Sequence, residues 1–110
     1  MNYDLAKKLK DAGFPQEVRL GDLYFGQNKP FIPHIFHTKS YKPKPIWVKI
    51  PTLSELIEAC GNIFNVLQLS DSGFWQCGSY CEGEFTEDSR GDTPEEAVAN
   101  LWLTLKIAIT

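Results

Sequence analysis

The end of the chain carries a complete helix-start signal followed by an almost wholly apolar run. Thr93 can cap the free backbone N–H groups of a helix, and Pro94 suits the first helical position. Glu96, three residues after Thr93, can close a capping box. The run that follows, Ala97 to Leu103, is apolar except for Asn100. We therefore predict a helix from about Pro94 to Ile107 that other parts of the fold must cover, and the signal carries no chemistry.

Size and composition are typical of one globular domain. The chain has 110 residues, 43% of them hydrophobic and 23% charged, which allows one modest core. No apolar run approaches the roughly 20 residues that span a bilayer, and the N-terminus does not resemble a signal peptide. Three cysteines, an odd number, argue against a disulfide framework and suggest reduced thiols. We expect a single domain over residues 1–110 and a cytoplasmic location.

Charge is distributed unevenly along the chain, although the net charge is only −3. Residues 1–50 hold nine basic and four acidic residues, a balance of +5, whereas residues 51–110 hold two basic and ten acidic residues, a balance of −8. Residues 29–49 contain five lysines and no acidic residue. This asymmetry can bias the choice of partner, or it can be satisfied within the fold if the two halves face each other.

The first half predicts one short helix and two strands. Residues 3–12 have Leu5, Leu9 and Ala12 at helical spacing, and Gly13 is well placed to end that helix. Residues 20–26 and 46–50 predict strands, the second with Trp47 and Lys49 on one face. Between them, residues 27–45 contain four prolines and predict a long irregular loop or a mobile hairpin.

The second half predicts a helix, a hairpin and the C-terminal helix. Thr52 and Glu55 form a capping box for a helix of about two turns that Gly61 ends. Residues 64–69 and 74–81 predict two strands joined by a turn at 70–73. Residues 82–91 predict an acidic, exposed connection with, at most, a short strand around 84–86. The predicted fold is α+β, an antiparallel sheet of three to four strands packed with about three helices in the order α-β-β-α-β-β-α.

Three stretches of the sequence, 3–15, 50–61 and 93–103, together resemble small uncharacterised proteins of tailed bacteriophages and prophages. The layout is also similar to the phage alpha-beta-alpha sandwich domain family, in which a hairpin precedes a C-terminal helix with a Thr-Pro type cap. The resemblance implies a phage or prophage origin, the bacterial host cytoplasm, and a role outside the virion and the replication machinery. It supplies no catalytic residues, because its motifs are helix caps.

The first candidate site is a basic segment interleaved with aromatic residues, which is the combination that single-stranded nucleic acid requires. The segment comprises Lys29, Phe31, His34, Phe36, His37, Lys39, Tyr41, Lys42, Lys44, Trp47 and Lys49. The alternative is a solvated loop whose aromatic side chains pack on the sheet. The acidic overall balance of the chain and the lack of arginine in the segment oppose nucleic-acid binding. Within this segment we select Lys39, Tyr41, Lys42, Lys44 and Trp47 as candidate partner-binding residues.

A second candidate site combines two histidines and two cysteines. His34 and His37 with Cys77 and Cys81 supply the donor atoms of a tetrahedral zinc site. The spacing argues against it, because residues four apart on one strand lie about 13 Å apart. A bulge at Gly78 would shorten that distance. We therefore predict neither a metal nor another cofactor.

The third candidate site is a cluster of acidic residues near the end of the chain, of which Glu82, Glu84, Glu87 and Asp88 are the candidate partner-binding residues. An exposed turn would leave the pKa values of such carboxyl groups unraised, which disfavours acid–base catalysis. The acids form either a solvated surface or a mimic of nucleic-acid phosphates that occupies the groove of a basic protein.

The function predicted from these features is binding rather than catalysis. No serine or cysteine has a recognisable nucleophile context, and no glycine-rich phosphate loop is present. We expect a non-enzymatic phage or prophage accessory protein that binds a host or phage macromolecule through the 27–45 loop, the acidic 82–92 face, or both. An inhibitor or modulator that acts through the acidic face is one form of this function. The alternative is a single-stranded nucleic-acid-binding protein that uses residues 29–49. The apolar C-terminal helix and the opposite charges also permit a homodimer.

Overall fold

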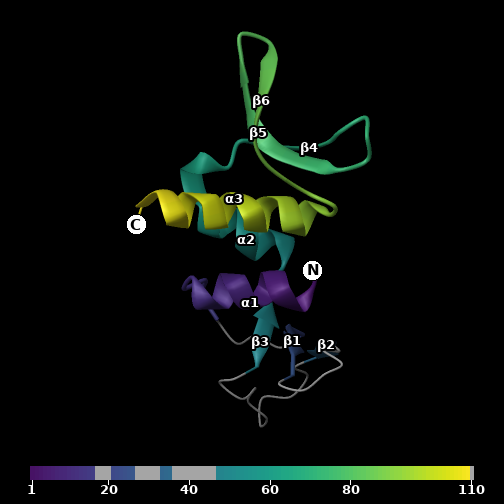
Figure 1. The fold of residues 1–110 in the computed structure, drawn as a ribbon, viewed down its shortest axis with the longest axis vertical. Helices are drawn as coiled ribbons and strands as arrows, with labels where there is room; N and C mark the ends of the chain where they lie inside the picture. The colour runs from purple at the N-terminus through teal and green to yellow at the C-terminus, as the bar shows by residue number, and fades with distance from the viewer. Residues whose placement is uncertain (17–20, 27–32, 36–46, 110) are drawn as a thin grey trace. The chain divides into compact units, whose positions relative to one another are not determined.

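The computed structural model describes residues 1–16, 21–26, 33–35 and 47–109, and these form two compact units. The first unit is Met1–Pro51 and the second is Thr52–Thr110. Each unit combines at least one helix with one three-stranded antiparallel sheet (Figure 1), which confirms the α+β class. The boundary between the units coincides with the change from a basic to an acidic sequence. The single domain over residues 1–110 stays a prediction.

The first unit packs one helix on a small sheet. Its elements are α1 (Tyr3–Asp11), β1 (Leu23–Phe25), β2 (Pro33–Ile35) and β3 (Val48–Ile50), with the strands in the order β2-β1-β3. Asn2 caps α1 by accepting a hydrogen bond from the Leu5 N–H at 2.8 Å. Ala6, Phe25 and Val48 form the core against which Met1, Tyr3 and Ile50 pack.

The predicted end of α1 at Gly13 is confirmed. Gly13 has a φ of 92°, a left-handed conformation that glycine adopts without steric cost. The N–H of Phe14 donates to the Leu9 carbonyl and that of Gly13 donates to the Lys10 carbonyl, which is the Schellman arrangement. Leu9 is buried as predicted, but Leu5 and Ala12 are only half-buried.

The prediction that Lys49 lies in an accessible basic segment is wrong. Its side chain is fully buried, and its Nζ lies 3.3 Å from Oδ2 of Asp22, whose side chain is also buried. Strand β3 has both faces covered at Val48 and Lys49, so the alternation expected of a half-exposed strand does not apply. A buried lysine requires a neutralising partner, and Asp22, directly before β1, supplies it.

The second unit packs two helices and a short 3₁₀ turn with a longer sheet. Its elements are α2 (Leu53–Cys60), η1 (Gly61–Ile63), β4 (Val66–Leu69), β5 (Trp75–Cys81), β6 (Glu84–Gly91) and α3 (Pro94–Ile109), with the strands in the order β4-β5-β6. Helix α3 packs on β5 and β6, and α2 packs on α3 (Figure 1). The capping box of Thr52 and Glu55 is confirmed, with both of its hydrogen bonds present.

Two strands differ from what the sequence predicted. Residues 33–35, inside the predicted irregular segment 27–45, form β2 and pair with β1, and the rest of that segment lies largely outside the described residues. Residues 84–91 form the whole of β6, where we predicted an exposed connection with a strand only around 84–86. Most of β6 was not recognised because the segment is rich in acidic residues. Phe85 and Glu87 alternate with more exposed residues, as a strand requires, and the extra residue Asp88 moves Ser89 to the opposite face.

Caps, a hydrogen bond to β6 and a close backbone approach at Gly91 fix the N-terminus of α3. The Thr93 hydroxyl accepts from the Glu96 N–H at 3.2 Å, but the Glu96 carboxylate accepts from Asp92 rather than from Thr93. The Ser89 hydroxyl donates to the Ala97 carbonyl at 2.8 Å. A Cβ on Gly91 would lie 2.5 Å from the backbone nitrogen of Ala97, so only glycine permits this approach.

We expect Gly91→Ala to lower the free energy of unfolding by about 1–3 kcal/mol, because the added methyl group pushes α3 away from β6. Gly26→Ala is the matched control, since a Cβ there meets only His34 at an ordinary 3.8 Å. Urea denaturation followed by circular dichroism measures both. Equal midpoints for the two variants would show that the close approach is not needed.

Candidate functional site

The hairpin of β5 and β6 extends beyond the helices of its unit. Figure 1 shows its closed end reaching away from α3. Cys81 pairs with Glu84, and the two residues between them, Glu82 and Gly83, have φ values of 53° and 83°. Positive φ at both central residues is the signature of the type I′ turn, whose twist matches that of the flanking strands. We call residues 79–86 the hairpin arm.

The sheet of the second unit has one face covered by α3 and one open face. Cys77 is fully buried and Ser89 bonds to α3, so the side chains that alternate with them along β5 and β6 point the other way. The register of the three strands then defines the open face. It consists of Val66, Gln68, Gln76, Gly78, Tyr80, Phe85, Glu87 and Arg90.

An aromatic pair occupies the hairpin-arm end of the open face. Tyr80 and Phe85 are directly paired across the strands, and their rings lie 5.3 Å apart at an angle of 58°. The Phe85 ring lies over Gly78, where a Cβ would come within 2.8 Å of it. Tyr80 remains 57% exposed. A two-stranded hairpin is marginally stable in water, so this pair supports the hairpin arm while presenting one ring to solvent.

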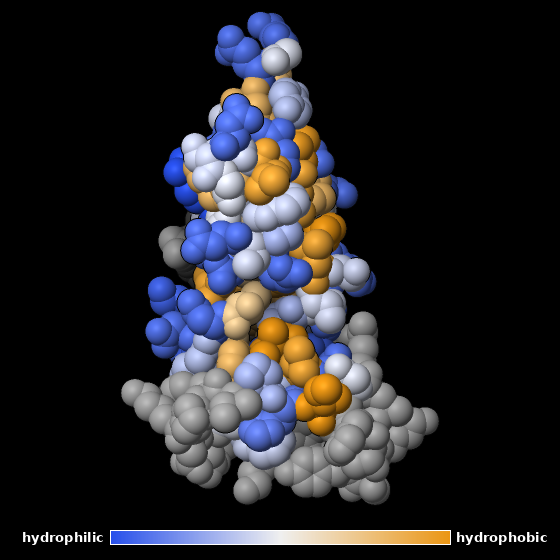
Figure 2. Space-filling model, turned by 90° about the vertical axis from the view of Figure 1, so that its right-hand side faces the viewer, coloured by the Kyte–Doolittle hydropathy of each residue, from blue (hydrophilic) through white to orange (hydrophobic). Residues whose placement is uncertain are grey.

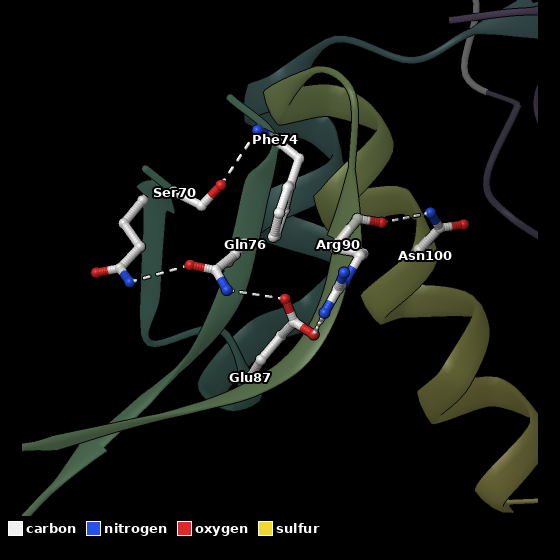
Figure 3. Close-up of polar contacts among 7 residues, drawn as sticks. Ser70, Phe74, Gln76, Glu87, Arg90 and Asn100 are labelled. Atoms are coloured by element: carbon white, nitrogen blue, oxygen red, sulfur yellow. Dashed lines mark hydrogen bonds and ion pairs between the residues drawn. The ribbon is translucent and has the colours of Figure 1, made fainter. Parts of the chain in front are cut away.

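A polar network occupies the rest of the open face (Figure 3). Tyr80 donates to the Gln68 side chain at 2.7 Å, Gln68 donates to Gln76 at 3.3 Å, and Gln76 donates to Glu87 at 2.9 Å. Arg90 donates twice to the other Glu87 oxygen, at 3.0 and 2.7 Å. These bonds to Arg90 and then Gln76 hold the pKa of Glu87 below its ordinary value. The ion pair of Glu87 and Arg90 in this network therefore carries no net charge.

Arg90 also links the open face to the helix behind the sheet. Its guanidinium lies 4.5 Å from the centroid of the Phe74 ring, a cation–π contact. Its backbone carbonyl accepts from the Asn100 side chain of α3 at 2.8 Å (Figure 3). The Phe74 backbone N–H in turn donates to the Ser70 hydroxyl in the β4–β5 turn. These contacts hold the end of the open face that lies away from the hairpin arm, where Trp75 pairs with Gly91.

The four predicted acidic residues do not share one surface. Glu82 lies in the turn and is exposed, as is Glu84 at the start of β6. Glu87 lies on the open face and is paired with Arg90. Asp88 is exposed and is the additional residue of a β-bulge, because Gly78 pairs with Glu87 while Cys77 pairs with Ser89. In Figure 2 the tip of the hairpin arm, at the top, is hydrophilic, with apolar groups interspersed below it.

The predicted basic and aromatic segment is described only in part. Lys39, Tyr41, Lys42 and Lys44 lie outside the described residues, as do Lys29, Phe31, Phe36 and His37. Trp47 is half-buried, and its ring stacks on that of the exposed His34 with a centroid distance of 6.2 Å. The Trp47 carbonyl accepts a hydrogen bond from the Lys10 ammonium at 2.8 Å.

The cysteines do not form a ligand set. Cys77 is buried and Cys81 is exposed, and the bulge adds its extra residue to β6, so β5 is not shortened between them. Among residues 1–16, 21–26, 33–35 and 47–109, no three histidine, cysteine or acidic side chains are grouped as a metal site requires. His37 lies outside the described residues.

The open face was not predicted from the sequence. Gln68, Gln76, Tyr80, Phe85 and Arg90 did not enter any candidate site. The usable signal is the alternation Gln76-x-Gly78-x-Tyr80 followed, after the turn, by Phe85-x-Glu87, which places these residues on one face once β6 is recognised as a strand.

Comparison of the chain with models of protein families, with curated proteins and with solved structures finds no match. None of the helices in the described ranges combines the length and the apolar composition that crossing a membrane requires.

We expect Glu87→Gln to lower stability at neutral pH and to have no effect in acid. A carboxyl group whose folded-state pKa is lowered stabilises the fold above its unfolded-state pKa, and that contribution is lost as the pH falls below about 4.5 through the folded-state value. The pair is partly exposed, so the loss at pH 7 is about 0.5 kcal/mol. Urea midpoints of both proteins between pH 3 and pH 7 measure it, and a difference independent of pH would contradict the expectation.

We expect one of the three thiols to react in the folded chain. Burial raises the pKa of Cys60 to about 11 and also raises that of Cys77, whereas Cys81 is exposed. At pH 8 a thiol with a pKa near 11 is a thiolate on the order of one time in a thousand. Iodoacetamide should therefore modify Cys81 alone until urea is added, as peptide mass spectrometry would show. Early modification of Cys60 would indicate that α2 opens readily.

Proposed function

We propose that this chain is a non-enzymatic protein that binds a host or phage protein through its acidic second unit, as an inhibitor or modulator. The resemblance of its helix caps to those of small phage and prophage proteins supports a phage or prophage origin and action in the bacterial cytoplasm. The pKa shifts of Cys60, Cys77 and Glu87 support binding rather than catalysis. The buried thiols have raised pKa values and Glu87 is held ionised, which are the reverse of an activated nucleophile and a catalytic acid.

The observation that carries this proposal is the coincidence of the charge division with the boundary between the units. Thr52–Thr110 contains ten acidic and two basic residues, a balance of −8, within one compact unit. Arg90, one of the two basic residues, is already paired with Glu87. A small unit with this balance repels nucleic-acid phosphates and attracts basic protein surfaces over several ångströms.

Single-stranded nucleic acid is the second candidate partner, through residues 29–49 of the basic first unit. The stacked rings of His34 and Trp47 favour it, because exposed aromatic rings stack on bases. The burial of Lys49 against Asp22 opposes it, since that lysine cannot contact a phosphate.

Two measurements on the full chain separate these functions. We expect the tagged chain to retain a stoichiometric protein from nuclease-treated bacterial lysate, released by rising salt because the contact is partly electrostatic. We also expect a fluorescent single-stranded 20-nucleotide probe to show no rise in anisotropy. Probe binding that weakens steeply with salt and on Lys42→Ala and Lys44→Ala substitution would instead establish the nucleic-acid function. If the chain retains no protein and the probe does not bind, both the protein-binding and the nucleic-acid-binding function are refuted.

A further inference from the structure

We infer that the protein partner docks on the hairpin arm and its open face, with Tyr80 as the central anchor. The occupant is a protein whose surface presents an apolar patch edged by lysine or arginine side chains. This inference rests on the proposed function and adds to it the location of the contact and the chemistry of the partner.

The Tyr80 ring is both exposed to solvent and held in place by its neighbours. Tyr80 is 57% exposed at the end of a strand, although its ring already packs against Phe85. Its hydroxyl is bonded to Gln68, so the ring is fixed in one orientation before any partner arrives. Tyrosine is enriched at the centres of protein interfaces, because it contributes a large contact area at a low cost in conformational entropy.

The surface beside the anchor is suited to close contact with a protein. Phe85 lies close over Gly78, which has no side chain to raise the surface there. Glu87 and Arg90 neutralise each other, and the amides of Gln68 and Gln76 are bonded within the network. A partner can therefore cover this area without burying an unpaired charge, whose desolvation would oppose binding.

The charges around the open face indicate the chemistry of the partner. Glu82 and Glu84 are exposed at the tip of the hairpin arm, and their unit carries a balance of −8. Charge complementarity selects a partner with basic residues at its edge. Nucleic acid does not fit, because its phosphates meet the same acids. A second copy docking through the same surface brings the acidic tip of one molecule near that of the other.

Six full-length baits test this inference in nuclease-treated bacterial lysate. Tyr80→Ala removes the anchor, and Leu69→Ala is its matched control, because Leu69 is 56% exposed on the opposite face of the same sheet. Tyr80→Phe keeps the ring and removes only the hydroxyl. Glu82→Lys reverses a charge at the tip, and Asp71→Lys makes the same change of net charge at the exposed β4–β5 turn. Wild type is the sixth bait, and circular dichroism confirms that each variant is folded.

The expected pattern is specific to the site. The protein retained by wild type, once identified and purified, should bind Tyr80→Ala at least about tenfold more weakly and should bind Leu69→Ala as wild type does. Tyr80→Phe should bind more tightly than Tyr80→Ala but less tightly than wild type, because it keeps the ring and loses the hydrogen bond that orients it. Glu82→Lys should slow its association more than Asp71→Lys does. If Tyr80→Ala does not fold, the pair of charge reversals decides the matter, because both sites are exposed.

Three other results would overturn the inference, and they are distinguishable from one another. Retention of no protein refutes the proposed function together with this surface. Retention of a protein by every variant alike leaves the proposed function standing and refutes the docking surface. A retained species identified as this chain itself, or a retained protein with an acidic surface, refutes the stated chemistry of the partner.

Discussion

The second unit depends on the close approach between the end of β6 and the start of α3. Gly91 allows the first turn of the helix to approach the strand at a distance that any side chain would prevent. Ser89 and Asn100 then bond across the junction, to Ala97 and Arg90 respectively. The apolar side of α3 is thereby laid on β5 and β6, and α2 packs on α3. A change at this junction alters the sheet as well as the helix, because one set of contacts fixes both.

The junction also explains how a small sheet supports a projecting hairpin. Arg90 lies immediately before Gly91, and its backbone carbonyl accepts a hydrogen bond from Asn100 of α3. On the open face its guanidinium bonds to Glu87 and lies over the Phe74 ring. Support from the helix is therefore transmitted through one strand to the open face. Beyond Glu87 the hairpin arm depends on its own turn and on the rings of Tyr80 and Phe85. A surface built in this way would need little rearrangement to bind the proposed partner.

The sequence predicted the helices well because their signals are local. The caps at Thr52 and Thr93 and the stop at Gly13 each depend on residues within one turn, and all three are present in the structure. Strand β6 was predicted only around 84–86, because its acidic residues have low strand propensity and only pairing with β5 makes the whole segment a strand. The burial of Lys49 was missed for a similar reason, since its partner Asp22 is 27 residues away in the sequence.

The difference between local signals and long-range pairing also explains why the acidic cluster was predicted while the open face was not. Charge is visible in composition, so the balance of −8 could be read without any structure. The open face is produced by register, which brings Gln68, Gln76 and Glu87 from three strands into one bonded row. Charge alone attracts many basic proteins, whereas a fixed aromatic ring beside a neutral polar row discriminates among them. In the proposed interaction, specificity depends on the register of β4, β5 and β6, and the net charge governs mainly how fast the partner associates.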